Sequence, residues 1–297
     1  MTTLYSQRDS NIRKTFLLIF AFLLLIIALG WLFSFILDNS LILIVVVIFS
    51  FLTSFFSYWF SDKVVLALTK AKPIEKRDNP ELYRLVENLC ITSGLPLPRI
   101  YILPETQPNA FATGRDEKHA VVAVTAGLLQ KLDRQELEGV IAHELSHIKN
   151  KDMLLQTIAV TLAGSIALLS HFFLRFTLFS GRGDSKNNNV LFLILGLFAA
   201  ILAPIAASLL KLSISRKREF LADASGALLT RYPEGLIRAL EKISHDQTKM
   251  RKPSNSTAHL FISSPFKGKE QKSWFSKLFL THPPTEERVK SLRGLKV

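Results

Sequence analysis

Cysteine is almost absent from this chain, because Cys90 is the only one among 297 residues. A lone thiol cannot form an intramolecular disulfide, which argues against a small disulfide-stapled scaffold and suits a reducing compartment. Acidic residues are also scarce, with 24 Asp and Glu against 37 Lys and Arg. The cations are spread over short segments without a recognisable nucleic-acid module, so a nucleic-acid partner is not expected.

Charge is missing altogether from four long stretches. Each has 22 to 24 residues without Asp, Glu, Lys or Arg, enough for a helix to cross a hydrocarbon core of about 30 Å. No series of carboxylates runs through them, which argues against a pump or ion carrier, and no polar stripe supports a nonselective pore. The sequence therefore predicts four transmembrane helices, at residues 15–37, 39–61, 153–174 and 187–210.

Lysine and arginine flank these stretches unevenly. They gather in the N-terminal tail and after the second and fourth stretches, whereas the turn at 38–40 has none. The positive-inside rule then places both termini and the central region in the cytoplasm. The first stretch lacks a small-residue cleavage site and is an anchor rather than a signal peptide. The expected layout is a tail (1–14), a transmembrane hairpin (15–61), a cytoplasmic region (62–152), a second hairpin (153–210) and a second cytoplasmic region (211–297).

The cytoplasmic region begins with a helix that has Pro80 at its first position and ends before Gly94. Three short segments rich in β-branched and aromatic residues follow, at 99–103, 109–114 and 120–125. Because they are short and close in sequence, we expect a small, mostly antiparallel sheet.

Residues 143–147 read H-E-L-S-H, which places His143 and His147 four residues apart. On a helix these imidazoles share one face and reach one metal ion, while Glu144 stands beside it. An apolar stripe and the pair Asp133 and Glu136, arranged as a capping box, predict that helix. Zinc suits two neutral imidazoles and lowers the pKa of a bound water, whose proton Glu144 is placed to accept.

A catalytic zinc site needs a third protein ligand on the same side of the membrane. Glu219 and Asp223 lie four apart just after the fourth stretch and share a helical face. Read alone, such a pair is more often a solvated surface. The second hairpin, however, returns the chain close to His147, so Glu219 is the expected third ligand and Asp223 is expected to orient a histidine.

These motifs resemble one known family. H-E-L-S-H, the later E-F-L-A-D at 219–223, N-A-F-A-T-G at 109–114 and T-H-P-P-T-E-E-R at 281–288 look like the HtpX-type membrane metalloproteases, gluzincin relatives of the CAAX prenyl endopeptidases. The resemblance runs nearly end to end and includes the four-span layout. It implies a mainly α membrane protein with a cytoplasmic α+β zincin-like domain and one zinc ion per chain.

The resemblance also implies a function. It points to an endopeptidase of the bacterial inner membrane that degrades misfolded membrane proteins, with its active site toward the cytoplasm. By position, His143, His147 and Glu219 would be zinc ligands, and Glu144 the general base. Residues 109–114 would form an edge strand that pairs with extended substrate.

Three questions stay open at this point. His282 either stabilises the oxyanion or occludes the metal, with Arg288 positioning it, or it belongs to a rigid turn. The basic and aromatic stretch 249–279 lies on the membrane surface or serves as a linker. A membrane scaffold or chaperone with a structural zinc is the alternative function, although a structural site has no use for Glu144.

Overall fold

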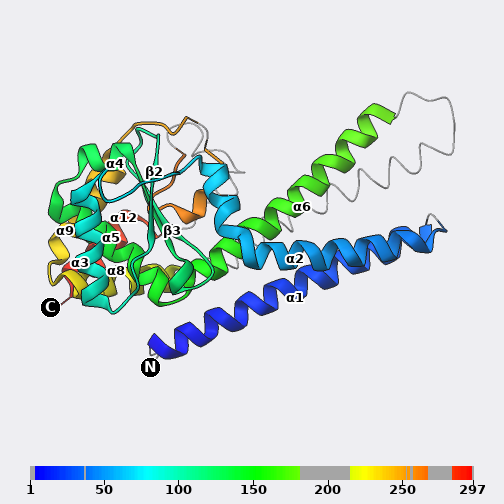
Figure 1. Cartoon of the computed structure of the whole chain (residues 1–297), viewed down its shortest axis with the longest axis horizontal. Coiled ribbons are helices and arrows are strands. Elements are labelled where there is room, and N and C mark those ends of the chain that lie inside the picture. Colours follow the sequence, from blue (N-terminus) through cyan, green and yellow to red (C-terminus); the bar gives the residue numbers. More distant parts are fainter. Residues whose placement is uncertain are drawn as a thin grey trace.

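The computed structural model describes residues 4–36, 38–180, 215–251, 253–254, 257–266 and 283–295. A domain of short helices around a small sheet stands at one end, and long helices project from it (Figure 1). The helices are α1 (Leu4–Ile36), α2 (Ser40–Thr69), α3 (Pro80–Ser93), α4 (Ala126–Lys131), α5 (Arg134–Lys149), α6 (Asp152–Ser180), α8 (Arg216–Thr230), α9 (Pro233–His245) and α12 (Thr285–Arg293). The strands are β1 (Lys72–Pro73), β2 (Arg99–Leu103), β3 (Ala110–Thr113) and β4 (Val121–Thr125).

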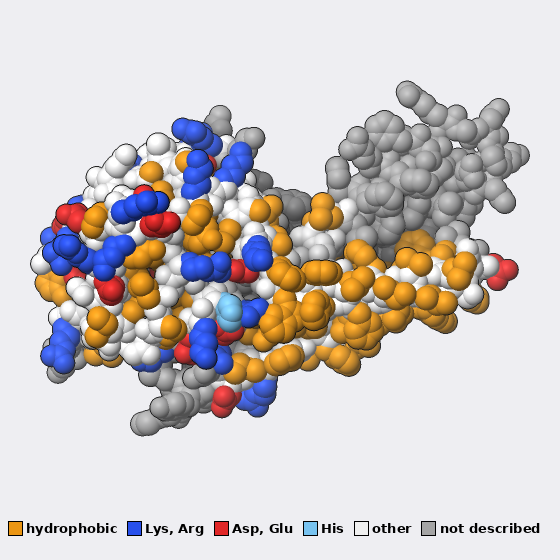
Figure 2. Space-filling view, viewed as in Figure 1, with side chains coloured by type: hydrophobic (Ala, Val, Ile, Leu, Met, Phe, Trp, Pro, Cys, Tyr) orange, Lys and Arg blue, Asp and Glu red, His pale blue; other side chains and the backbone are white. Residues whose placement is uncertain are grey.

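The long helices account for the membrane part of the chain. Among the described residues, α1 and α2 are long and apolar enough to cross a membrane, and the count is three if α5 and α6, which meet at 80°, are one bent span. Apolar side chains cover the exposed surface of this hairpin (Figure 2). The predicted third span falls within α6, and the predicted fourth span, 187–210, lies outside the described residues.

Residues 1–14 were predicted to form a polar tail, but from Leu4 onward they belong to the first spanning helix. Helix α1 begins at Leu4 and runs without a break into the membrane. Asn11 and Thr15, on its first described turns, are buried. The N-terminal end of α1 is therefore held against the rest of the protein.

The sheet is small and mixed: two of its three strand pairs are antiparallel, as expected of a mostly antiparallel sheet, and the central pair is parallel, which was not expected. Its strand order is β1-β2-β4-β3, with β2 and β4 parallel and the two outer pairs antiparallel. The parallel pair arises because the loop after β2 leads the chain to the position of β3, which is not next to β2. The space between β2 and β3 is then occupied by β4. Strand β3 then turns back through a hairpin into β4, and β4 inserts beside β2. As a result, β3 is left at the edge.

Helices α5, α8 and α9 pack closely against one another beside the sheet (Figure 1). Gly139 of α5 allows one contact, because a Cβ there would lie 2.6 Å from the Leu236 backbone nitrogen of α9. Gly226 of α8 allows the other, because a Cβ there would lie 2.9 Å from the backbone nitrogen of His143. A glycine inside a helix destabilises the helix by about 1 kcal/mol relative to alanine. At these two positions the missing side chain allows the neighbouring helices to approach closely.

Candidate metal centre

The H-E-L-S-H segment lies on α5, which begins as the sequence predicts. The Asp133 side chain accepts a hydrogen bond from the Glu136 backbone N–H, and the Glu136 side chain accepts one from the Asp133 backbone N–H. This capping box satisfies two backbone donors that a helix start leaves free. His143, Glu144 and His147 are buried further along the same helix.

Helix α8 brings Glu219 to the two histidines. The Nε2 atoms of His143 and His147 lie 3.1 Å apart, and the Glu219 carboxylate oxygens lie 3.6 Å from His147 Nε2 and 3.9 Å from His143 Nε2. A tetrahedral zinc site with bonds of about 2.0–2.1 Å has ligand atoms about 3.3–3.4 Å apart. Two imidazole nitrogens and one carboxylate at these separations fit a zinc ion and leave a fourth position for another ligand.

Each candidate histidine ligand faces a second carboxylate with its other ring nitrogen. His143 Nδ1 lies 2.9 Å from Asp223 Oδ1, as the shared face of α8 predicted. His147 Nδ1 lies 3.1 Å from Asp152 Oδ2. These contacts hold both rings with Nε2 toward Glu219, the orientation that metal-binding histidines adopt in proteins.

Arg288 of α12 holds Asp223 in place. Its Nε donates to Asp223 Oδ2 at 2.8 Å and its Nη2 to Asp223 Oδ1 at 2.6 Å, and both side chains are buried. Burial opposes charge on Asp223, but the Arg288 guanidinium outweighs it and lowers the pKa of this carboxyl to about 2. The expected partner of Arg288 was His282, which lies outside the described residues. In the described chain, Arg288 acts on the carboxylate behind His143.

A buried polar network surrounds Asp152, on the His147 side of the candidate metal centre. The sequence did not predict this network. Asn11 of α1 donates to Asp152 Oδ1 at 2.6 Å and to the Asn150 carbonyl at 3.0 Å. Arg218 of α8 donates to Asn11 Oδ1 at 3.0 Å, and its Nε lies 3.4 Å from Asp152 Oδ1. The first spanning helix is thereby tied to the carboxylate behind His147. The one signal in the sequence was an aspartate five residues after His147.

Glu144 occupies an environment suited to proton transfer. Its carboxylate accepts a hydrogen bond from the Ala112 backbone N–H of β3. Burial disfavours its charged form and raises its pKa to about 7, with Glu219 adding to the rise and His147 opposing it. A carboxyl with a pKa near neutrality both accepts and returns a proton at physiological pH.

Strand β3 lies at the sheet edge, where residues 109–114 were expected to bind substrate. Three backbone groups on its free edge, however, already have partners in the described structure. Ala110 N–H donates to Asn109 Oδ1 at 3.2 Å, the Ala110 carbonyl accepts from Ile262 N–H at 2.9 Å, and Ala112 N–H faces Glu144.

The segment that pairs with β3 comprises residues 261–265 and is called here the edge segment. Asn109 clamps it, because its Nδ2 donates to the Ser263 carbonyl at 2.8 Å and its Oδ1 accepts from Ser263 N–H at 3.2 Å. Phe261 packs edge-on against Phe111, with ring centroids 5.2 Å apart. The edge segment therefore stands where a paired peptide would lie.

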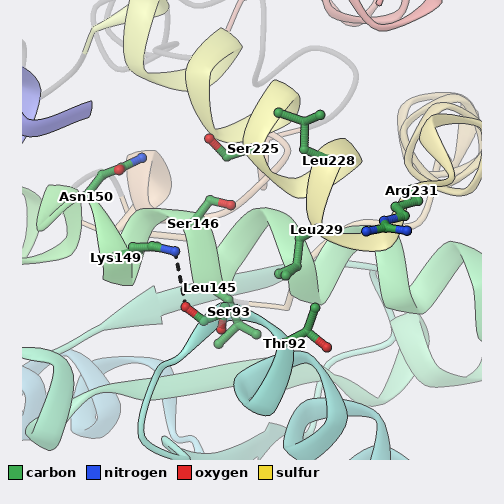
Figure 3. Close-up of a pocket in the computed structure, with 10 residues that line it drawn as sticks. All are labelled: Thr92, Ser93, Leu145, Ser146, Lys149, Asn150, Ser225, Leu228, Leu229 and Arg231. Carbon is green, nitrogen blue, oxygen red and sulfur yellow. Dashed lines mark hydrogen bonds between the residues drawn. The ribbon is translucent and has the colours of Figure 1, made fainter. Parts of the chain in front are cut away.

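A separate pocket of about 320 Å³ opens between α3, α5 and α8 (Figure 3). Ser146 and Lys149 of α5 line it, and Lys149 donates to the Ser93 carbonyl of α3 across it. The candidate metal ligands are not among its lining residues. This pocket is consequently distinct from the candidate metal centre.

Comparisons with known proteins give consistent results. The model of peptidase family M48 matches residues 76–296. A protein described as "Protease HtpX homolog" from Thermoanaerobacter pseudethanolicus is 46% identical over 300 residues, covering 99% of this chain and 98% of that protein. One of the same description from Pyrococcus furiosus is 51% identical over 247 residues and covers 82% of each. The crystal structure of S. mikatae Ste24p is similar in fold, with a TM-score of 0.50 and 19% identity over 97% of this chain and 67% of that one.

Proposed function

The chain belongs to peptidase family M48 and is a membrane-bound metalloendopeptidase, and we propose that it cuts membrane proteins at a zinc ion held by His143, His147 and Glu219. The convergence of these three side chains is the observation that carries the proposal. They come from two helices, and their ligand atoms all lie within 4.8 Å of one another. Two buried carboxylates behind the histidines add the support that such ligands require.

A zinc ion bound there supplies a Lewis acid that polarises a carbonyl and lowers the pKa of water. Glu144 accepts the proton of the attacking water and passes it to the departing amine. The Ala112 N–H orients the Glu144 carboxylate for these steps. The two histidines stay fixed through the reaction, because Asp223 and Asp152 hold their outer nitrogens.

Substrate enters as an extended strand along β3. The backbone groups of Ala110 and Ala112 on the free edge alternate with those that pair with β4, as a strand edge requires. In the described conformation the Ala110 carbonyl is bonded to Ile262. A substrate peptide therefore has to displace the edge segment from β3 before the carbonyl group of the bond to be cut can approach Glu144.

The distribution of charge supports four spans with the catalytic domain and both termini in the cytoplasm of a bacterial cell. His147 lies five residues before Asp152, the first residue of α6, so the metal centre stands close to the membrane surface. A metal centre at this position can reach the cytoplasmic segments of misfolded membrane proteins, so we propose such proteins as the substrates. Protein quality control in the inner membrane is the role we assign.

The test compares the purified full-length protein with its Glu144→Gln variant in detergent. Both are stripped with a chelator and reloaded with zinc, and bound zinc and cleavage of an unfolded protein such as casein are recorded. Both should bind one zinc per chain and only the unaltered protein should cut. Equal cutting by the two, or no zinc on either, would leave a scaffold or chaperone as the better description.

A further inference from the structure

A second pocket, lined by charged and aromatic side chains, lies where the domain meets the membrane hairpin. It has a volume of about 370 Å³ and forms between residues 59–63 of α2, the start of β2 and the turn that joins β3 to β4. None of its lining residues belongs to the metal centre described above. They are Trp59, Phe60, Asp62, Lys63, Arg99, Arg115, Lys118 and His119.

The position of this pocket along α2 matches the edge of the bilayer. The long uncharged stretch of α2 ends at Ser61, and Lys63 is its first cation. Trp59 and Phe60, one turn earlier, are 42% and 38% exposed, in the manner of aromatic side chains at a membrane interface. Lys and Arg side chains are spread over the visible face of the domain, including the part next to the apolar surface of the hairpin (Figure 2).

The charge of the pocket favours an anion. Four cations line it, and two of them already have carboxylate partners: Arg99 lies 2.6 Å from Asp62 and Arg115 lies 3.3 Å from Asp116. Lys63 and Lys118 remain. Lys63 lies 4.9 Å from the centre of the Phe60 ring. Within the part of the chain that the structure describes, neither Lys63 nor Lys118 forms an ion pair. Both ammonium groups are exposed and can turn toward a ligand.

Arg115 is held in place before any ligand arrives. Its guanidinium carbon lies 4.4 Å from the centre of the Trp59 ring, and the side chain is only 21% exposed. Its Nε donates to Asp116 at 3.3 Å, and its Nη2 lies 2.8 Å from His119 Nε2. An arginine fixed in this way loses little conformational entropy on binding, and its planar donors match the oxygens of a phosphate.

We propose that this pocket binds the phosphate of an anionic phospholipid in the leaflet that faces the domain. Lys63, Arg115 and Lys118 would contact the head group, and the acyl chains would continue along the exposed apolar surface of α2. The aromatic residues favour a lipid over a free phosphate ion, because Trp59 and Phe60 offer an apolar surface directly beside the cations. Such a lipid would hold the β3–β4 turn, and the sheet attached to it, at a fixed distance from the membrane surface.

The experiment counts lipid molecules bound to the full-length protein by native mass spectrometry in a neutral detergent. The probes are phosphatidylglycerol, phosphatidylcholine and inorganic phosphate, each titrated separately. The variant is Lys63→Gln with Lys118→Gln. Its matched control is Arg84→Gln with Lys290→Gln, which removes two exposed cations from α3 and α12, on the side of the domain away from α2 (Figure 1).

The unaltered protein and the control should bind phosphatidylglycerol with the same affinity and in preference to phosphatidylcholine. The double variant should bind it about tenfold or more weakly, since each juxtamembrane cation contributes appreciably to the attraction of anionic lipid. Equal binding by variant and control would overturn the proposal. Saturation by inorganic phosphate, without preference between the two lipids, would overturn the lipid assignment and leave a free-phosphate site.

Discussion

Asn11, in the first membrane-spanning helix, donates a hydrogen bond of 2.6 Å to Asp152, the carboxylate that lies behind His147. The two residues are 141 positions apart in sequence. Because Arg218 donates to the same asparagine from α8, the helix that carries Glu219, one side chain of α1 links both ligand-bearing segments. The position of α1 and the geometry of the metal centre are therefore coupled.

Replacing Asn11 with alanine should loosen the metal. The change removes the donor to Asp152 and the acceptor for Arg218, so the His147 ring loses part of its support. Altered partners of metal ligands typically weaken binding tenfold to a hundredfold, and we expect about tenfold faster zinc release to a chromogenic chelator. Asn88→Ala, on the exposed face of α3, is the control. Release at the rate of the unaltered protein would show that α1 and the metal centre are independent.

Gly226→Ala should weaken metal binding although alanine is the better helix former. A Cβ at this position would lie 2.9 Å from the His143 backbone nitrogen, so α8 must shift away from α5 and carry Glu219 and Asp223 with it. Helix propensity alone would favour the change by about 1 kcal/mol. We expect zinc affinity to fall about tenfold or more. Gly164→Ala is the control, because no atom of the described residues lies within 4 Å of its added Cβ. Unchanged affinity in both variants would contradict this account of α5–α8 packing.

Cys90 is the only cysteine in the chain, so the pH dependence of its alkylation can be measured without a signal from other thiols. Burial raises the pKa of Cys90 from 9.0 to about 11, so its thiolate at pH 8 is about a hundredfold rarer than in an exposed cysteine. Alkylation of the folded protein should be slow at pH 8 and rise steadily toward pH 11. Because the folded-state pKa is raised, the stability that the neutral thiol contributes is complete below pH 9 and declines as the pH rises through 11.

Iodoacetamide labelling of the full-length protein, followed by mass spectrometry, measures this rate. Cys90→Ser supplies the blank, and protein unfolded in denaturant supplies the exposed reference. A labelling rate at pH 8 equal to that of the unfolded chain would show that the thiol is not protected by the core around α3.

Local signals in the sequence predicted which side chains of the candidate site share a helical face. The capping box at Asp133, the shared helical face of His143 and His147, and that of Glu219 and Asp223 all depend on residues within one helix, where spacing decides direction. The placement of α8 near α5 was expected from the predicted hairpin between them, and the two helices pack together in the structure. These residues converge in the structure as expected, and their catalytic roles remain proposals.

Long-range pairings could not be predicted in the same way. Asn11 and Arg288 reach the metal centre across 141 and 65 positions respectively, and no local period marks either residue. The parallel pairing of β2 with β4 was missed for a related reason, since the order of short strands depends on where a loop crosses and not on the strands themselves. The edge segment carries no strand signal, because Pro265 and two serines interrupt it.

The last prediction concerns that edge segment and depends on the proposed role of β3. Proline at position 262 removes the N–H that donates to the Ala110 carbonyl, while Ile262→Ala keeps it and shortens the same buried side chain. A typical hydrogen bond contributes about 1 kcal/mol, so freeing the edge should lower KM for an unfolded protein about fivefold with little change in kcat. Thermal unfolding of both variants reports the shared cost of losing the isoleucine side chain. If Ile262→Pro cuts no better than Ile262→Ala, the Ile262 hydrogen bond does not compete with substrate, and the peptide reaches Glu144 by another route.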